Sequence, residues 1–190
     1  WLYSWMWKRA KGFFDVVAYT GNATARVIPH SLGVVPEMIW VKKRSAAKSW
    51  SVYHKDLTST GQFLSLDNTY ADTSNSNFWN NGVDHTSTTF SIHTTGYVNS
   101  ANATYISFHF ATLAGISKVG SYTGNGSNHV WDSARGIVAG NEPYFRLNIA
   151  GGEITNNDSV DPHNSGFIVN QLSATNINVS SGTYIFYAIA

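Results

Sequence analysis

Thr104-Tyr-Ile-Ser-Phe-His-Phe-Ala111 and Thr183-Tyr-Ile-Phe-Tyr-Ala-Ile-Ala190 decide the fold of this chain. Both stretches consist mainly of aromatic and β-branched residues, which favour extended strands. They begin with the same three residues, Thr-Tyr-Ile, and end with the same alanine. A strand-forming stretch that occurs twice indicates a β fold assembled from two copies of one unit.

Three further pairs of segments match in the same order along the chain. They are Asp15-Val-Val-Ala-Tyr-Thr-Gly-Asn22 with Lys118-Val-Gly-Ser-Tyr-Thr-Gly-Asn125, Phe63-Leu-Ser-Leu66 with Tyr144-Phe-Arg-Leu147, and Phe90-Ser-Ile92 with Phe167-Ile-Val169. We therefore expect an N-terminal connector at residues 1–12 and two repeats, at 13–114 and 115–190. The joining segment Thr112-Leu-Ala-Gly-Ile116 is too short for a flexible linker, so the repeats are expected to pack side by side.

Every strong segment predicts a strand, and no segment of about ten residues shows a helical period of 3.6. Glycine- and asparagine-rich turns separate these segments, and in Thr20-Gly-Asn22 the glycine is expected to supply a positive φ. The predicted class is all-β, with two tandem antiparallel β-sandwich-like repeats. The predicted strands are 13–20, 38–42, 49–53, 62–66, 88–93, 103–111, 119–123, 144–147, 167–169 and 182–190.

The second repeat is short by about 22 residues between Asn125 and Trp131, because matching segments lie 103 residues apart at the first block and 81 at the second. The first repeat has the end of a strand, a turn and a buried strand at this place. Losing them would leave unpaired sheet edges. Either evolution removed these residues and another segment covers the gap, or they exist but are unresolved and the sequence is joined across them. We favour the second explanation.

The composition excludes several classes of protein. Charged residues make up 12% of the chain, the formal net charge is +1, and there is no cysteine. Nucleic-acid binding requires clustered lysine and arginine, so no nucleic-acid partner is expected. No apolar run of about 18 residues is present, so no membrane insertion is expected. A disulfide scaffold and a thiolate zinc site are also excluded.

Three tryptophans stand close to the beginning of the sequence, at Trp1, Trp5 and Trp7. Because position 1 is not methionine and no signal-peptide pattern follows, we expect it to be an interior point of a longer chain. Three exposed tryptophans would be costly in water, so they are candidate contacts to a partner. The alternative is that they cap the core of their own domain.

The histidines and acidic residues predict no metal site, no cofactor and no catalytic centre. No two histidines have the i, i+4 spacing of a metallohydrolase, and the Gly-x-Ser-x-Gly pattern is absent. The loop acids Glu153, Asp158 and Asp161 are oxygen donors of the type that binds Ca²⁺, but the dedicated calcium-loop pattern is missing. Solvated carboxylates are therefore favoured.

A sugar site is a weaker candidate. Carbohydrate recognition combines an aromatic face with planar amides, and Asn77-Phe-Trp-Asn-Asn81 has this mixture. The candidate glycan contacts are Asn77, Trp79, Asn80 and Asn81. In the alternative interpretation Trp79 folds back onto the core.

Several segments resemble a repeated β domain of tailed, marine or cyanobacterial bacteriophages. They include Trp5-Met-Trp-Lys-Arg-Ala-Lys-Gly-Phe-Phe14, Ile39-Trp-Val-Lys42, Trp131-Asp-Ser-Ala-Arg-Gly136 and Ser165-Gly-Phe-Ile-Val169. The resemblance covers nearly the whole chain and carries no catalytic residues.

The resemblance implies a non-enzymatic structural virion protein, most simply a tail or tail-fibre module for assembly or host attachment. Its implied partners are other copies of the chain and other virion proteins, with a host surface glycan as a further candidate. The alternatives are a capsid decoration protein and a carbohydrate-binding module. A glycan-degrading enzyme ranks last, because the acidic residues are sparse.

Overall fold

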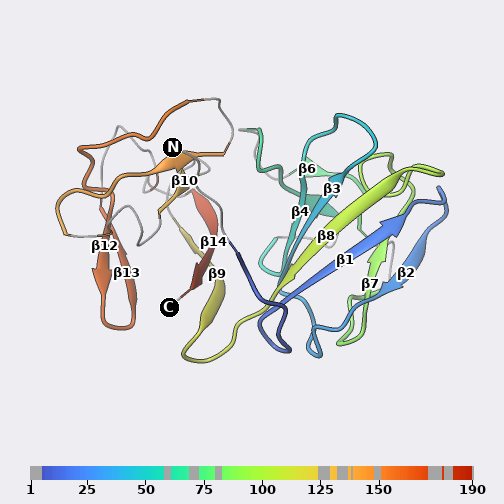
Figure 1. The fold of residues 1–190 in the computed structure, drawn as a ribbon, viewed down its shortest axis with the longest axis horizontal. Coiled ribbons are helices and arrows are strands. Elements are labelled where there is room, and N and C mark those ends of the chain that lie inside the picture. Colours follow the sequence, from blue (N-terminus) through green and yellow to red (C-terminus); the bar gives the residue numbers. More distant parts are fainter. Residues whose placement is uncertain are drawn as a thin grey trace. The chain divides into compact units, whose positions relative to one another are not determined.

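The computed structural model describes residues 6–57, 61–68, 73–79, 83–123, 129–131, 137, 139–147, 151–170, 177 and 182–189. Within these ranges the protein is all-β, its strand pairs are antiparallel, and no helix occurs (Figure 1). The predicted all-β, antiparallel class is thus confirmed. The described residues contain no helix long and apolar enough to cross a membrane.

The chain divides into two compact units. Unit 1 comprises Trp1–Ser65, Tyr70–Gly120 and Phe186–Ala190, and unit 2 comprises Leu66–Thr69 and Ser121–Ile185. The C-terminal residues therefore return to the unit in which the chain begins.

Unit 1 contains a four-stranded sheet in the order β1 (Phe14–Thr20), β8 (Thr104–Phe110), β3 (Met38–Lys43) and β4 (Ser51–His54) (Figure 1). The stretch that dominates the sequence, β8, is paired on both sides. Its last residue, Phe110, lies opposite Phe14 on one side and Met38 on the other. A central strand rich in aromatic residues is what the sequence pattern predicts.

A second sheet supplies the other layer of the sandwich. Strand β2 (Arg26–Pro29) pairs with β7 (Thr89–Ile92). Alternate residues of β3 and β8 point to the same core as alternate residues of β2 and β7, as the two-residue period of a strand requires. The buried core cluster comprises Ile28, Ile39, Val41, Phe78, Trp79, Phe90, Ile92, Val98, Ala103 and Tyr105. A further short pair in this unit joins β5 (Gln62–Phe63) to β6 (Thr73–Ser74).

Gly21 ends β1 for a reason other than the predicted positive φ. Its N–H donates to the Ala103 carbonyl at 2.8 Å, and its own carbonyl accepts from Asn102 N–H at 2.9 Å. A Cβ at this position would lie 2.1 Å from the Ser100 carbonyl oxygen. Positive φ occurs instead at Gly33, with φ 80°. Close backbone approach, rather than an unusual φ, therefore requires glycine at position 21.

The remaining strands form three further pairs. Strand β9 (Ser117–Thr123) pairs with β14 (Thr183–Ile189). Residues 117–120 of β9 and 186–189 of β14 belong to unit 1, and the other residues of both strands belong to unit 2. Within unit 2, β10 (His129–Val130) pairs with β11 (Phe145–Arg146), and β12 (Val160–His163) pairs with β13 (Gly166–Val169).

Matched positions of the two expected repeats make matching contacts. Tyr19 stacks on Tyr105 with ring centroids 5.1 Å apart, and Tyr122 stacks on Tyr184 at 4.8 Å. In each pair the first tyrosine donates its hydroxyl to a backbone carbonyl. The acceptors are Val98, at 2.8 Å, and Ile177, at 3.0 Å. These contacts support the tandem repeat, which stays a prediction, and the expected gap after Asn125 lies largely outside the described residues.

Candidate functional site

The structure describes one of the three tryptophans that were predicted to contact a partner. Trp7 is half-buried, and its ring lies 5.2 Å from Phe14, 5.5 Å from Phe110 and 6.3 Å from Tyr187. It therefore caps an aromatic cluster of its own unit, as in the alternative considered for it. Trp1 and Trp5 lie outside the described residues.

Trp79 does not form a sugar platform. Its side chain is 1% exposed and belongs to the core of unit 1, where its ring lies 6.0 Å from Tyr53 and 6.4 Å from Phe78. A buried ring offers no face to a sugar, so the expected glycan contact at Trp79 is wrong. Asn77 is exposed, whereas Asn80 and Asn81 lie outside the described residues.

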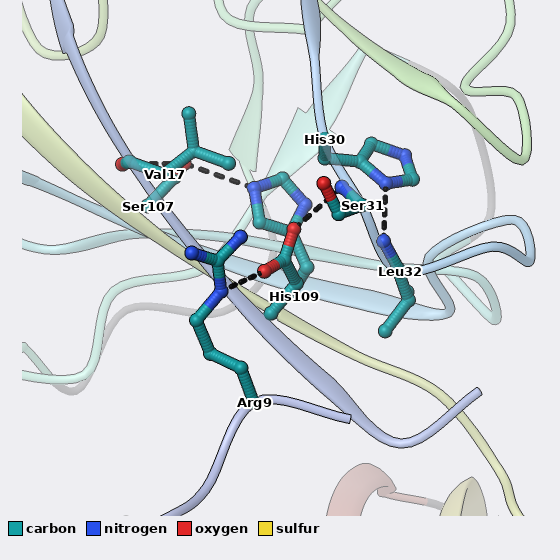
Figure 2. A network of polar contacts seen from close by, with 8 residues as sticks. Arg9, Val17, His30, Ser31, Leu32, Ser107 and His109 are labelled. Carbon is teal, nitrogen blue, oxygen red and sulfur yellow. Dashed lines mark hydrogen bonds and ion pairs between the residues drawn. The ribbon is translucent and has the colours of Figure 1, made fainter. Parts of the chain in front are cut away.

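The most developed polar constellation in the described part of unit 1 is instead a buried network that begins at Asp15 of β1. Asp15 is 2% exposed and accepts hydrogen bonds from the Arg9 guanidinium and, at 2.6 Å, from Ser31 N–H (Figure 2). Burial alone would raise the pKa of Asp15, but the Ser31 and Arg9 donors outweigh it and lower that pKa. The carboxylate thus fixes the turn after β2 to the edge of the sheet.

Ser107 and His109 of β8 continue this network on the core side of the sheet. Ser107 donates its hydroxyl to the Val17 carbonyl at 3.2 Å, and its Oγ lies 2.9 Å from His109 Nε2 (Figure 2). Since the single hydroxyl proton goes to Val17, the pairing is satisfied when His109 Nε2–H donates to Ser107 Oγ. His109 Nδ1 then carries a lone pair with no hydrogen-bond partner.

His30 lies next to this pair, and hydrogen bonds at both of its ring nitrogens fix its orientation. Its Nδ1 accepts Leu32 N–H at 3.2 Å, and its Nε2 lies 3.1 Å from the Thr86 carbonyl, so Nε2 carries the proton. The His30 ring stacks on His109 at 5.1 Å. Burial lowers the pKa of His30, and burial followed by the nearby His30 lowers the pKa of His109 to about 3. Both rings are therefore neutral at pH 7.

A serine beside a histidine invites comparison with a hydrolase, and the geometry argues against it. A nucleophilic serine must give its proton to the imidazole and must reach a substrate. Here the hydroxyl proton is directed to Val17, and both Ser107 and His109 are 0% exposed. The arrangement can stabilise the fold but cannot meet a substrate from solution.

The network gives a direct stability prediction. Ser107→Ala is expected to lower the free energy of unfolding by about 1–3 kcal/mol, because it leaves the buried His109 Nε2–H without an acceptor. Urea denaturation at pH 7 measures the change. Thr104→Ala removes an exposed hydroxyl from the same strand and should change stability by less than about 0.5 kcal/mol. Equal effects of the two variants would contradict the assigned hydrogen bond.

Comparison with known proteins gives one match. Residues 6–145 match a family described as "Domain of unknown function (DUF7483)". No curated protein matches the chain, and neither does any solved structure. The matched segment covers most of the sequence and extends from unit 1 into unit 2. The chain therefore belongs to the DUF7483 family.

Proposed function

We propose that this chain is a non-enzymatic structural module of a tailed-bacteriophage virion, part of a tail or tail fibre, that works as an assembled oligomer in the extracellular particle. One observation carries the proposal. The four-stranded sheet of unit 1 is apolar on both faces. The face that points away from the core has one part in which Phe14, Met38 and Phe110 are buried, and a second part whose apolar side chains are only half-buried.

We define the outer face of this sheet by Val16, Trp40, Ile106 and Phe108. The register aligns Val16, Phe108 and Trp40 in one row across β1, β8 and β3. Their neighbours in sequence point to the core, so these side chains point away from it. All four are half-buried. The outer face of an antiparallel sandwich sheet is usually polar, so apolar side chains here indicate a surface that a partner covers.

Further aromatic rings extend the outer face. Trp50 lies 6.0 Å from Phe108, and Trp7 lies 6.4 Å from Trp40. Lys42 Nζ lies 5.6 Å from the Trp50 ring, so a cation borders the apolar area. Aromatic anchors surrounded by polar groups are typical of protein interfaces. The arrangement therefore supports a role in assembly.

Two other observations support the same function. The segments quoted in the sequence analysis resemble virion domains of tailed bacteriophages, and that resemblance brings no catalytic residues. The Ser–His pair in the described part of unit 1 is fully buried. Neither observation requires chemistry on a substrate.

Substitution on the outer face tests the assembly role. Phe108→Lys is expected to weaken self-association by at least about 30-fold, equivalent to about 2 kcal/mol, because a charge replaces an interface ring. Sedimentation velocity over a range of concentrations measures this change, and circular dichroism checks the fold. Val27→Lys places the same charge at a residue of β2 that is already 46% exposed, so it should leave association unchanged. A monomeric wild-type chain, or unchanged association of Phe108→Lys, would refute the proposal.

Labelling of virions tests the location. Gold-labelled antibodies against the recombinant chain should bind along the tail or its fibres in electron micrographs of the phage. Labelling over the whole capsid would favour the decoration alternative. Absence of label from disrupted and intact particles alike would contradict a virion location.

A further inference from the structure

Unit 2 contains a group of three carboxylates that folding brings together. Glu142 precedes β11, Asp158 precedes β12, and Asp161 lies on β12. One carboxylate oxygen from each residue lies within 4.8 Å of the other two. Like charges at this spacing repel one another, so the arrangement requires a compensating group.

Glu142 is the residue that indicates a ligand. Its side chain is 0% exposed. Oε2 accepts hydrogen bonds from Ser159 N–H at 2.9 Å and Val160 N–H at 3.3 Å. Oε1 is equally buried and has no hydrogen-bond partner. A buried carboxylate oxygen without a donor is costly unless a cation or a proton satisfies it.

The donors that the described residues provide to the two aspartates are neutral. Asn170 Nδ2 donates to Asp158 Oδ1 at 2.8 Å and to Asp161 Oδ2 at 3.0 Å. Gly140 N–H lies 3.3 Å from Asp161 Oδ1. The ion pairs found among the described residues involve Asp15 and Asp56 and none of these three acids. These donors orient the carboxylates, and within the described part of unit 2 no ion pair compensates their negative charge.

We propose that Glu142, Asp158 and Asp161 bind a calcium ion. The donors are all oxygens, which suits a hard cation, and neither histidine nor cysteine joins the group. Ca²⁺ binds oxygen at about 2.3–2.6 Å and accepts six to eight ligands in a flexible geometry, whereas Mg²⁺ requires a near-ideal octahedron and gives up its water reluctantly. Three oxygens that lie within 4.8 Å of one another can bind one such ion, and water completes its coordination.

The proposal revises the expectation that the acids of this unit are solvated loop carboxylates. That expectation rested on Glu153, Asp158 and Asp161 and did not include Glu142. Of these four acids, Glu142 is the one that is completely buried, and Glu153 is exposed and lies outside the group.

Calorimetric titration of the chain with CaCl₂ at pH 7.5 tests the site. We expect one equivalent of Ca²⁺ to bind, with a Kd of about 0.1–1 mM, as in extracellular calcium modules. In 10 mM CaCl₂ the thermal midpoint should rise by about 3–10 °C relative to EGTA. The same concentration of MgCl₂ should give less than half of that rise. A wild-type chain with neither heat of binding nor a thermal shift in CaCl₂ would overturn the proposal.

Two variants and a matched control identify the ligands. Glu142→Gln keeps the size of the buried side chain and is expected to abolish the Ca²⁺-dependent shift. Asp158→Asn changes an exposed residue, so it leaves the fold intact and should weaken binding at least about 10-fold. Glu153→Gln removes the same charge outside the group and should bind as the wild type does. If both Asp158→Asn and Glu142→Gln bind Ca²⁺ like the wild type, the assigned site is wrong. The proposal also fails if Ca²⁺ has no effect on the wild type and Glu142→Gln is more stable than the wild type in EGTA. That result would show that a proton, not a cation, satisfies Glu142.

Discussion

Acidification from pH 7 to about pH 4.5 is expected to unfold unit 1 cooperatively. The groups responsible are His54 and His109, which are 1% and 0% exposed, with a smaller contribution from the half-buried His85. Burial lowers the pKa of His54 to about 4 and that of His109 to about 3. Burial, followed by the nearby His30, lowers the pKa of His85 to about 4. Each ring is therefore held neutral in the folded state.

Hydrogen bonding explains why these rings cannot simply accept a proton. Nδ1 of His54 accepts Asp56 N–H at 3.2 Å, and Nδ1 of His85 accepts Ser91 N–H at 3.1 Å. A proton on Nδ1 would place two N–H donors against each other. For His109, the unpartnered Nδ1 is enclosed in the core, where an imidazolium would have no counter-charge in hydrogen-bond contact.

The direction of the effect follows from proton linkage. In the unfolded chain each histidine has a pKa of about 6.5, so below that pH the unfolded state binds more protons than the folded state. Stability is therefore complete above pH 6.5 and falls as the pH decreases towards the folded pKa values near 4 and 3. Each such histidine contributes up to about 1.4 kcal/mol per pH unit. The combined slope near pH 5.5 should be about 3 kcal/mol per pH unit.

Urea denaturation at pH 7, 6.5, 6, 5.5 and 5, followed by tryptophan fluorescence, measures this slope. His54→Gln should reduce the slope by about 1.4 kcal/mol per pH unit, which corresponds to one proton. This reduction is expected whatever effect the substitution has on the free energy of unfolding at pH 7. Val27→Gln changes a side chain of unit 1 that is 46% exposed and carries no titratable group, so it should leave the slope unchanged. A free energy of unfolding that is constant between pH 7 and pH 5 would contradict the burial of these histidines.

The sequence predicted the long strands because their composition leaves little alternative. Strands β1, β3, β8 and β14 lie within about a residue of the predicted ranges. The short β12 was not predicted, because Pro162 lies within it and proline is rare inside strands. Here β12 pairs with β13 alone, so a proline without an N–H is tolerated.

The sites were less predictable, because they depend on which face of a strand is buried. Along β8, the aromatic residues Tyr105 and Phe108 point to opposite faces, and so do the neighbours Ser107 and Phe108. The pattern therefore predicts a strand without deciding its inner face, and only pairing with β1 and β3 directs Ser107 and His109 to the core. Glu142 was not predicted as a site residue for a similar reason. It lies outside any strand pattern and meets Asp158 and Asp161 only after folding.

Trp79→Ala is expected to lower the free energy of unfolding of unit 1 by about 3–5 kcal/mol. The side chain is 1% exposed and belongs to the core cluster, so truncation removes buried apolar surface and leaves a cavity beside Phe78 and Tyr53. Urea denaturation at pH 7.5, where the buried His54 and His109 are neutral, measures the loss. Trp50→Ala, on the half-buried outer face, should cost less than half as much.

Trp79→Phe distinguishes the contribution of ring packing to stability from that of the indole N–H. The indole Nε1 of Trp79 is buried without a hydrogen-bond partner. Phenylalanine keeps most of the ring and removes this unsatisfied N–H, so the variant should lose less than about 2 kcal/mol. A sugar-binding Trp79 would behave in the opposite way, because replacing an exposed ring with alanine would leave stability unchanged and abolish sugar-dependent changes in fluorescence. If Trp79→Ala loses stability and Trp79→Phe keeps most of it, Trp79 belongs to the core. If both variants are as stable as the wild type, Trp79 lies at the surface.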